Sequence, residues 1–97
     1  MQVIAEEPWD WFLFEDDGIL YLDVLVERGA VSFAVTTALS TAQSADYERD
    51  GVACLARMSG EMRHKALTRE WQATVLPPGW SERSLAAVRE WQQRRDG

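Results

Sequence analysis

The chain has 97 residues, of which 46% are hydrophobic, and a formal net charge of −6 at pH 7. This length suits one small domain, and the hydrophobic fraction is that of a folded protein rather than a disordered one. No apolar run approaches the ~18 residues of a membrane span, and residues 1–10 lack the positive charge of a signal peptide. The single cysteine, Cys54, excludes an internal disulfide, which favours a cytoplasmic location. A periplasmic location after removal of a leader stays open.

The charge is unevenly distributed along the chain. Every charged residue in residues 1–27 is acidic, namely Glu6, Glu7, Asp10, Glu15, Asp16, Asp17, Asp23 and Glu27. Residues 28–97 carry ten basic and eight acidic side chains. The acidic part disfavours nucleic acid as a ligand and favours a basic partner protein. Solvated carboxylates at turns would produce the same pattern.

Residues 11–39 are predicted to form a three-stranded antiparallel meander. In residues 19–27 every even position is apolar, and in residues 30–39 the larger side chains stand at odd positions. Because side chains alternate between the faces of a strand, both sets should face one core. They are Leu20, Leu22, Val24 and Val26 on one strand and Val31, Phe33, Val35, Thr37 and Leu39 on the other.

Matching these two faces sets the predicted register of the second hairpin. A turn closed by Glu27 and Ala30, with a positive φ at Gly29, brings the large residues together. The predicted pairs are Val26 with Val31, Val24 with Phe33 and Leu22 with Val35. A shift by one residue would set small side chains such as Ser32 against the apolar face, and is therefore disfavoured.

The first hairpin allows two loops. A three-residue loop over residues 16–18 places Phe12 and Phe14 on the core face. Its pairs are Phe14 with Leu20 and Phe12 with Leu22, and its outer face carries Trp9, Trp11, Leu13 and Tyr21. A two-residue loop would instead bury Trp11 and Leu13. We favour the three-residue loop, which leaves an exposed aromatic patch of the kind that marks interfaces.

The flanking segments complete the expected elements. Residues 1–10 should be extended, with a short edge strand at 1–5, since Pro8 is tolerated only at an edge or outside the ladder. Ser40 and Thr41 are suited to starting a helix over residues 41–50, which Gly51 either kinks or ends. A second helix from residue 52 has an apolar stripe at helical spacing. The stripe is Val52, Leu55, Ser59, Met62 and Ala66, and it should cover the apolar face of the sheet.

The C-terminal part contains an ambiguous segment and a clearer helix. Residues 69–76 alternate in polarity, which fits a fourth strand or an extended segment, and Pro77-Pro78-Gly79 ends regular structure. The last helix should begin with Ser81 as its N-cap. Trp80 and Leu85 are placed for a hydrophobic staple, and its apolar face is Leu85, Val88 and Trp91.

These elements predict an α+β domain spanning residues 1–97. An N-terminal antiparallel β-meander of three to four strands packs against two to three C-terminal helices in two layers. Little in the chain suits catalysis: His64 is the only histidine, and Cys54 would lie ~15 Å away on the same helix and is expected to be buried. These two residues are too few for a zinc site, and the 15–18 segment lacks the spacing of a calcium loop.

The sequence therefore favours a small, non-enzymatic interaction module that binds a basic partner protein through its acidic, aromatic sheet. We expect no cofactor, no metal, and neither nucleic acid nor membrane as a partner. An immunity- or antitoxin-like role is one concrete case, and a homodimer is another way to cover the patch. The candidate partner-binding residues are Trp9, Trp11, Glu15, Asp16, Asp17, Tyr21 and Asp23. The alternatives are a ligand-binding or enzymatic domain with a pocket between sheet and helices, and a structural module of a larger assembly.

Overall fold

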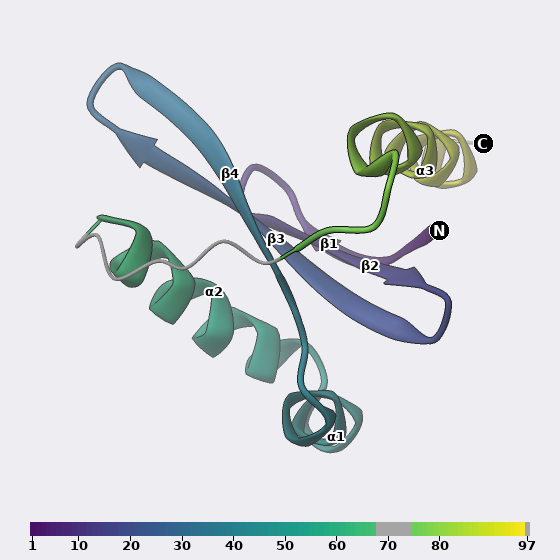
Figure 1. The fold of residues 1–97 in the computed structure, drawn as a ribbon, viewed down its shortest axis with the longest axis horizontal. Coiled ribbons are helices and arrows are strands. Elements are labelled where there is room, and N and C mark those ends of the chain that lie inside the picture. Colours follow the sequence, from purple (N-terminus) through teal and green to yellow (C-terminus); the bar gives the residue numbers. More distant parts are fainter. Residues whose placement is uncertain (68–74, 97) are drawn as a thin grey trace.

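A computed structural model of the chain describes residues 1–67 and 75–96. Within these residues four strands precede three helices (Figure 1). The strands are β1 (Gln2–Glu7), β2 (Trp11–Asp16), β3 (Ile19–Arg28) and β4 (Val31–Ala38), and the helices are α1 (Thr41–Asp50), α2 (Val52–Leu67) and α3 (Trp80–Asp96). The strands form one antiparallel sheet in the order β1-β2-β3-β4. The predicted α+β class, with an N-terminal antiparallel sheet and C-terminal helices, is confirmed.

The β3–β4 hairpin keeps the predicted faces but not the predicted register. Arg28 pairs with Val31, so the loop is Gly29-Ala30, and only Gly29 has a positive φ, of 61°. This is the φ pattern of a type II′ turn, which has glycine at its first central position. The observed pairs are Val26 with Phe33, Val24 with Val35 and Leu22 with Thr37. The predicted register was wrong by two residues, a shift that leaves every side chain on the same face and is therefore invisible to an apolar pattern.

The β2–β3 hairpin has the two-residue loop, so the favoured three-residue loop was wrong. Asp16 pairs with Ile19, and Asp17 and Gly18 have φ values of 52° and 79°. Positive φ at both central positions is typical of the type I′ turn, for which Asp-Gly is a strong signal. The predicted exposure of Trp11 and Leu13 is corrected accordingly, because their side chains are only 3% and 0% exposed.

The sheet buries side chains on both of its faces. One face packs on α2 through an apolar cluster that contains Trp11, Leu13, Leu22, Val24, Val26, Val35, Leu39, Leu55 and Met62. The opposite face packs on α3 through Val3, Phe14, Tyr21 and Ala87. Both phenylalanines of β2 thus lie on the α3 side, not in the cluster under α2. Figure 1 shows α2 running beneath the sheet and α3 at the end of the sheet nearest the N-terminus.

The helical boundaries follow their capping residues. Ser40 caps α1 in a capping box with Gln43, and Gly51, at φ 66°, ends α1 before α2 begins. Of the predicted α2 stripe, Leu55, Ser59 and Met62 are buried, as is Cys54, whereas Val52 is 52% exposed. Two successive helices separated at Gly51 therefore form, and the stripe begins one turn later than predicted.

Helix α3 begins at Trp80, so the predicted N-cap Ser81 lies inside its first turn. Trp80 packs against Phe14 and Tyr21, with ring centroids 5.5 Å and 4.9 Å apart. Leu85 is 52% exposed and does not belong to the apolar face, where Ala87 is buried instead. The predicted fourth strand over residues 69–76 lies largely outside the described residues, and the fourth strand of the observed sheet is β1.

Candidate interaction groove

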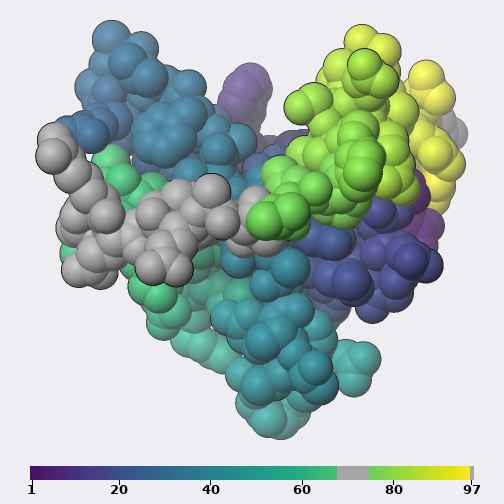
Figure 2. All heavy atoms as spheres, viewed as in Figure 1, coloured from purple at the N-terminus to yellow at the C-terminus, as the bar shows by residue number. Residues whose placement is uncertain are grey.

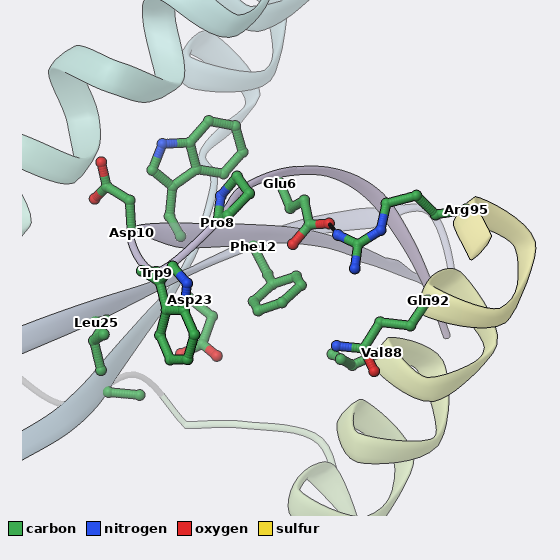
Figure 3. A pocket seen from close by; sticks show the side chains of 12 residues that line it. Glu6, Pro8, Trp9, Asp10, Phe12, Asp23, Leu25, Val88, Gln92 and Arg95 are labelled. Carbon is green, nitrogen blue, oxygen red and sulfur yellow. Dashed lines mark hydrogen bonds and ion pairs between the residues drawn. The ribbon is translucent and has the colours of Figure 1, made fainter.

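A groove of about 390 Å³ lies on the α3 side of the sheet. Figure 2 shows the hollow between the β3–β4 hairpin and α3. Most of its wall is apolar, formed by Pro8, Trp9, Trp11, Phe12, Leu25, Ala34 and Val88. Its polar lining residues are Glu6, Asp10, Asp23, Gln92 and Arg95 (Figure 3). The β1–β2 turn, the open half of the sheet and α3 therefore supply three different walls.

The groove exists because α3 covers only part of its face of the sheet. Polar contacts attach the helix to β1 and β2: Arg83 Nη2 lies 2.5 Å from Asp16 Oδ1, and Arg95 Nη1 lies 2.5 Å from Glu6 Oε1. The indole Nε1–H of Trp91 donates to the same Glu6 oxygen at 2.8 Å. Because these contacts hold α3 over the β1–β2 half, Leu25 and Ala34 on the β3–β4 half stay outside its cover.

Trp9 forms the rim of the groove in the β1–β2 turn. Its side chain is 92% exposed, and its backbone adopts a left-handed conformation with φ 66°. A bulky L-residue in this region is an outlier that costs about 1–2 kcal/mol. The backbone N–H of Asp10 donates to the Glu7 carbonyl at 3.0 Å and closes the turn around it. An exposed indole is thus held in place by a strained turn.

Helix α2 fixes this turn from the opposite side of the sheet. The Arg63 guanidinium pairs with the Asp10 carboxylate and donates from Nε to the Leu25 carbonyl at 3.3 Å. The Leu25 N–H donates in turn to the Asp10 carbonyl at 2.9 Å. Arg63 therefore joins the β1–β2 turn to β3 beside Trp9.

Asp23 lies in the floor of the groove, in the middle of β3. It stands between Phe12 of β2 and Thr36 of β4, and the Thr36 hydroxyl donates to its carboxylate at 2.8 Å. Burial raises the pKa of the Asp23 carboxyl above its usual 3.8, while the bond from Thr36 acts in the opposite direction. Among the described residues no basic side chain pairs with this carboxylate. A half-buried carboxylate without a cation is an attractive partner for an incoming positive charge.

The predicted aromatic patch is not a single surface. Trp9 is exposed, but Trp11 and Tyr21 are 3% and 6% exposed and lie in the clusters on opposite faces of the sheet. The two-residue loop of the β2–β3 hairpin causes this, since it turns Trp11 toward α2. The predicted exposure of Trp11 and Tyr21 was therefore wrong, since both are core residues, although Trp11 also contributes to the groove lining.

The predicted acidic cluster lies away from the groove. Glu15, Asp16 and Asp17 stand at the β2–β3 turn, about 10–17 Å along the chain from Phe12, which lines the groove. Asp16 is buried beside Arg83, which holds the pKa of its carboxyl below the usual value. The Glu15 carboxylate accepts from Gln2 Nε2 at 3.2 Å and from the Gly18 N–H at 3.0 Å. Asp16 is thus a structural residue, and Glu15 stabilises its own turn.

The groove contains residues that the sequence analysis did not assign to a site. Val88, Gln92 and Arg95 come from α3, and the Glu6–Arg95 pair spans 89 positions of the chain. No spacing pattern predicts a pair so distant. One signal was available in the sequence. Because no basic residue precedes Arg28, any ion pair of a carboxylate in residues 1–27 with a Lys or Arg side chain must involve a later part of the chain.

Residues 1–67 and 75–96 contain neither of two other kinds of site. No group of three or more His, Cys, Asp or Glu side chains there is arranged to hold a metal ion. No helix in those ranges combines the length and the apolar character needed to cross a membrane. No family model, curated protein or solved structure matches the chain. The functional argument therefore depends on the geometry of the groove.

Proposed function

We propose that this chain is a non-enzymatic interaction module whose groove binds a basic segment of a partner protein. The observation that carries the proposal is Trp9, an indole 92% exposed on the rim of an apolar groove. Tryptophan is enriched among the residues that dominate binding energies at interfaces. Covering 150–250 Å² of its surface would contribute roughly 4–6 kcal/mol before the entropic cost of association.

The basic character of the partner follows from the acidic side chains around the groove. Asp23 in the floor has no cationic partner among the described residues. Glu7 is exposed next to the β1–β2 turn, and Glu27 is exposed farther along β3. Asp23, Leu25 and Glu27 share one face of β3 because they alternate with its buried residues. A lysine or arginine next to a large apolar side chain would satisfy both Asp23 and Trp9.

The acidic groups proposed to bind the partner differ from most of those predicted from the sequence. Glu6, Asp10 and Asp16 are already paired with Arg95, Arg63 and Arg83 respectively. These carboxylates are therefore occupied, and the carboxylate of the groove lining that has no basic partner among the described residues is that of Asp23. An immunity- or antitoxin-like role and a cytoplasmic location stay predictions within this proposal.

A selection from a random displayed-peptide library against the immobilised full chain tests the proposal. Bound sequences should combine Lys or Arg with a large apolar residue, and their binding should weaken as salt rises. Trp9→Ala should weaken a selected peptide at least tenfold, whereas Leu85→Ala, which removes an exposed apolar side chain outside the groove, should not. Equal binding to Trp9→Ala would contradict the proposal.

The charge requirement has its own matched pair of variants. Asp23→Asn keeps the shape of the floor and an acceptor for Thr36 but removes the negative charge. Asp17→Asn removes the same charge from the exposed β2–β3 turn. Only Asp23→Asn should weaken the binding of a basic peptide. Equal weakening by both variants would show that binding depends on the overall net charge and not on Asp23.

A small cationic ligand is the second candidate, favoured by the size of the groove. A volume of about 390 Å³ falls within the range of small-molecule sites, roughly 300–1,000 Å³. Native mass spectrometry of the purified chain, with and without Trp9→Ala, separates the two candidates. A retained small molecule that Trp9→Ala releases would favour the ligand site over the peptide site.

A further inference from the structure

Strand β4 is an unprotected edge of the sheet. Among residues 1–67 and 75–96 its only neighbour in the sheet is β3, and its sequence, VSFAVTTA, contains no charged residue and no proline. Edge strands are normally protected by charges, prolines, bulges or a covering element. The tip of the β3–β4 hairpin projects beyond both α2 and α3 (Figure 1). β4 therefore lacks the sequence features that prevent pairing with another strand.

The opposite edge shows the contrast. β1 has an irregularity in its pairing between Val3 and Ala5, and it ends with Glu6, Glu7 and Pro8. A break in register, two carboxylates and a proline are features that discourage an additional strand. The protected β1 and the unprotected β4 are thus different ends of one sheet.

The register of β3 and β4 decides which groups of β4 point outward. Arg28 and Val31 close a two-residue loop, so odd-numbered residues of β4 exchange hydrogen bonds with β3. The Leu39 N–H, which donates to the Leu20 carbonyl at 2.8 Å, continues this pattern. The backbone N–H and C=O groups of Ser32, Ala34 and Thr36 therefore point away from the sheet.

The side chains at this edge are exposed as well. Val31 is 62% exposed and Phe33 is 37% exposed, and both lie on the α2 side of the sheet. Ser32 and Ala34 are exposed on the α3 side. An apolar, uncharged stretch with outward backbone groups is suited to forming main-chain hydrogen bonds with a further strand.

We propose that β4 pairs in antiparallel fashion with β4 of a second copy of this chain, about a two-fold axis at Ala34. Ala34 then faces its own copy, and Ser32 faces Thr36 of the second copy, so that all three outward-pointing residues exchange hydrogen bonds. On the α2 side Phe33 faces Val35 of the second copy and is covered by it. The product is a continuous eight-stranded sheet, since each copy contributes four strands.

A second copy fits this edge better than an unrelated strand for reasons of charge and symmetry. Two chains of net charge −6 repel one another, but β4 carries no charge, so the contact brings no like charges face to face. A two-fold axis at the small residue Ala34 makes the edge self-complementary, as an isologous interface requires. The pairing requires no ligand in the groove, although Ala34 at the axis also lines it.

Light scattering coupled to size-exclusion chromatography of the full chain tests the dimer. The expected mass is twice 11.0 kDa at high micromolar concentration. Ala34→Pro removes an outward N–H, and Ala34→Lys sets two like charges across the axis, so both should give the single-chain mass. Ala53→Lys, at an exposed position on α2, should stay a dimer. A single-chain mass for the unmodified protein, or dimers in both Ala34 variants, would overturn the proposal.

Cysteine crosslinking tests the register itself. The paired Ala34 Cα atoms would lie about 5.5 Å apart, within the range of a disulfide, so Ala34→Cys should give a covalent dimer on mild oxidation. Ser32→Cys should not, because the two copies of residue 32 would stand at least about 13 Å apart. The native Cys54 is only 4% exposed, so the unmodified chain provides the background level of crosslinking. Equal crosslinking of the two variants would contradict a two-fold axis at Ala34.

Discussion

The two faces of the sheet are constructed in different ways. Under α2, an apolar cluster fills the space between sheet and helix, with Leu13, Leu22 and Leu55 fully buried. On the α3 side a smaller cluster is supplemented by ion pairs from Arg83 and Arg95, and half of the face stays open. We therefore expect the α2 side to provide most of the stability, and we assign the proposed binding surface to the α3 side.

The largest effect should come from truncating the core under α2. Leu22→Ala removes a side chain that is 0% exposed and should lower the free energy of unfolding by about 3 kcal/mol. Urea denaturation measures the change. Leu85→Ala, at a side chain 52% exposed, is the matched control and should change stability by less than about 0.5 kcal/mol. Similar losses in the two variants would remove the distinction between core and surface.

A smaller and more local effect is expected on the α3 side. Trp80→Ala removes the half-buried ring that packs on Phe14 and Tyr21, and should cost about 2 kcal/mol. Hydrogen exchange should then show α3 amides losing protection while α2 amides keep theirs, because α2 packs on the other face. Equal loss of protection in both helices would show that the two sides unfold as one unit.

Trp9 should behave in the opposite way from a core tryptophan. Trp9→Gly relieves a left-handed φ of 66° and removes an exposed ring, so it should raise the free energy of unfolding by about 1 kcal/mol while abolishing binding in the groove. Trp9→Ala keeps the unfavourable backbone and should give no comparable gain. Destabilisation by the glycine variant in thermal unfolding would show that Trp9 has a structural role.

The smallest effects concern pH and have opposite signs at two aspartates. The pKa of Asp16 is below its unfolded value of 3.8 because of the Arg83 hydrogen bond, so its contribution is present above that pH and is lost as pH falls through the folded pKa. Burial raises the pKa of Asp23, so the folded state binds the proton more tightly and gains stability as pH falls through this raised pKa toward 3.8. Asp16→Asn and Asp23→Asn should change the pH dependence of urea unfolding in opposite directions.

The faces of the strands and the ends of α1 could be predicted from the sequence, whereas the hairpin registers could not. Alternation in β3 and β4 predicted most of the side chains that pack under α2, but Val31 and Phe33 of the predicted core set are exposed. Ser40 and Gly51 marked the limits of α1. The hairpin registers could not be obtained in this way, because a two-residue shift conserves both faces and the loop chemistry at Asp17-Gly18 decides the rest.

The candidate site was less predictable than the fold. Two long-range contacts position its α3 wall. Arg83 and Asp16 are 67 positions apart in the sequence, and Arg95 and Glu6 are 89 positions apart. Local periodicity carries no information on such contacts. Of the seven predicted partner-binding residues, Trp9, Trp11 and Asp23 line the groove, and composition alone could not separate them from the other four.

The most direct test of the open α3 face is an NMR titration of the tryptophan indole N–H signals with a selected basic peptide. The chain has five tryptophans, and comparison with Trp9→Phe assigns the signal of Trp9. Binding in the groove predicts that the Trp9 signal shifts most, while those of the buried Trp11 and of Trp80, whose ring packs on Phe14 and Tyr21, change less. An unchanged Trp9 signal at saturating peptide would contradict the assignment of the groove as the binding site.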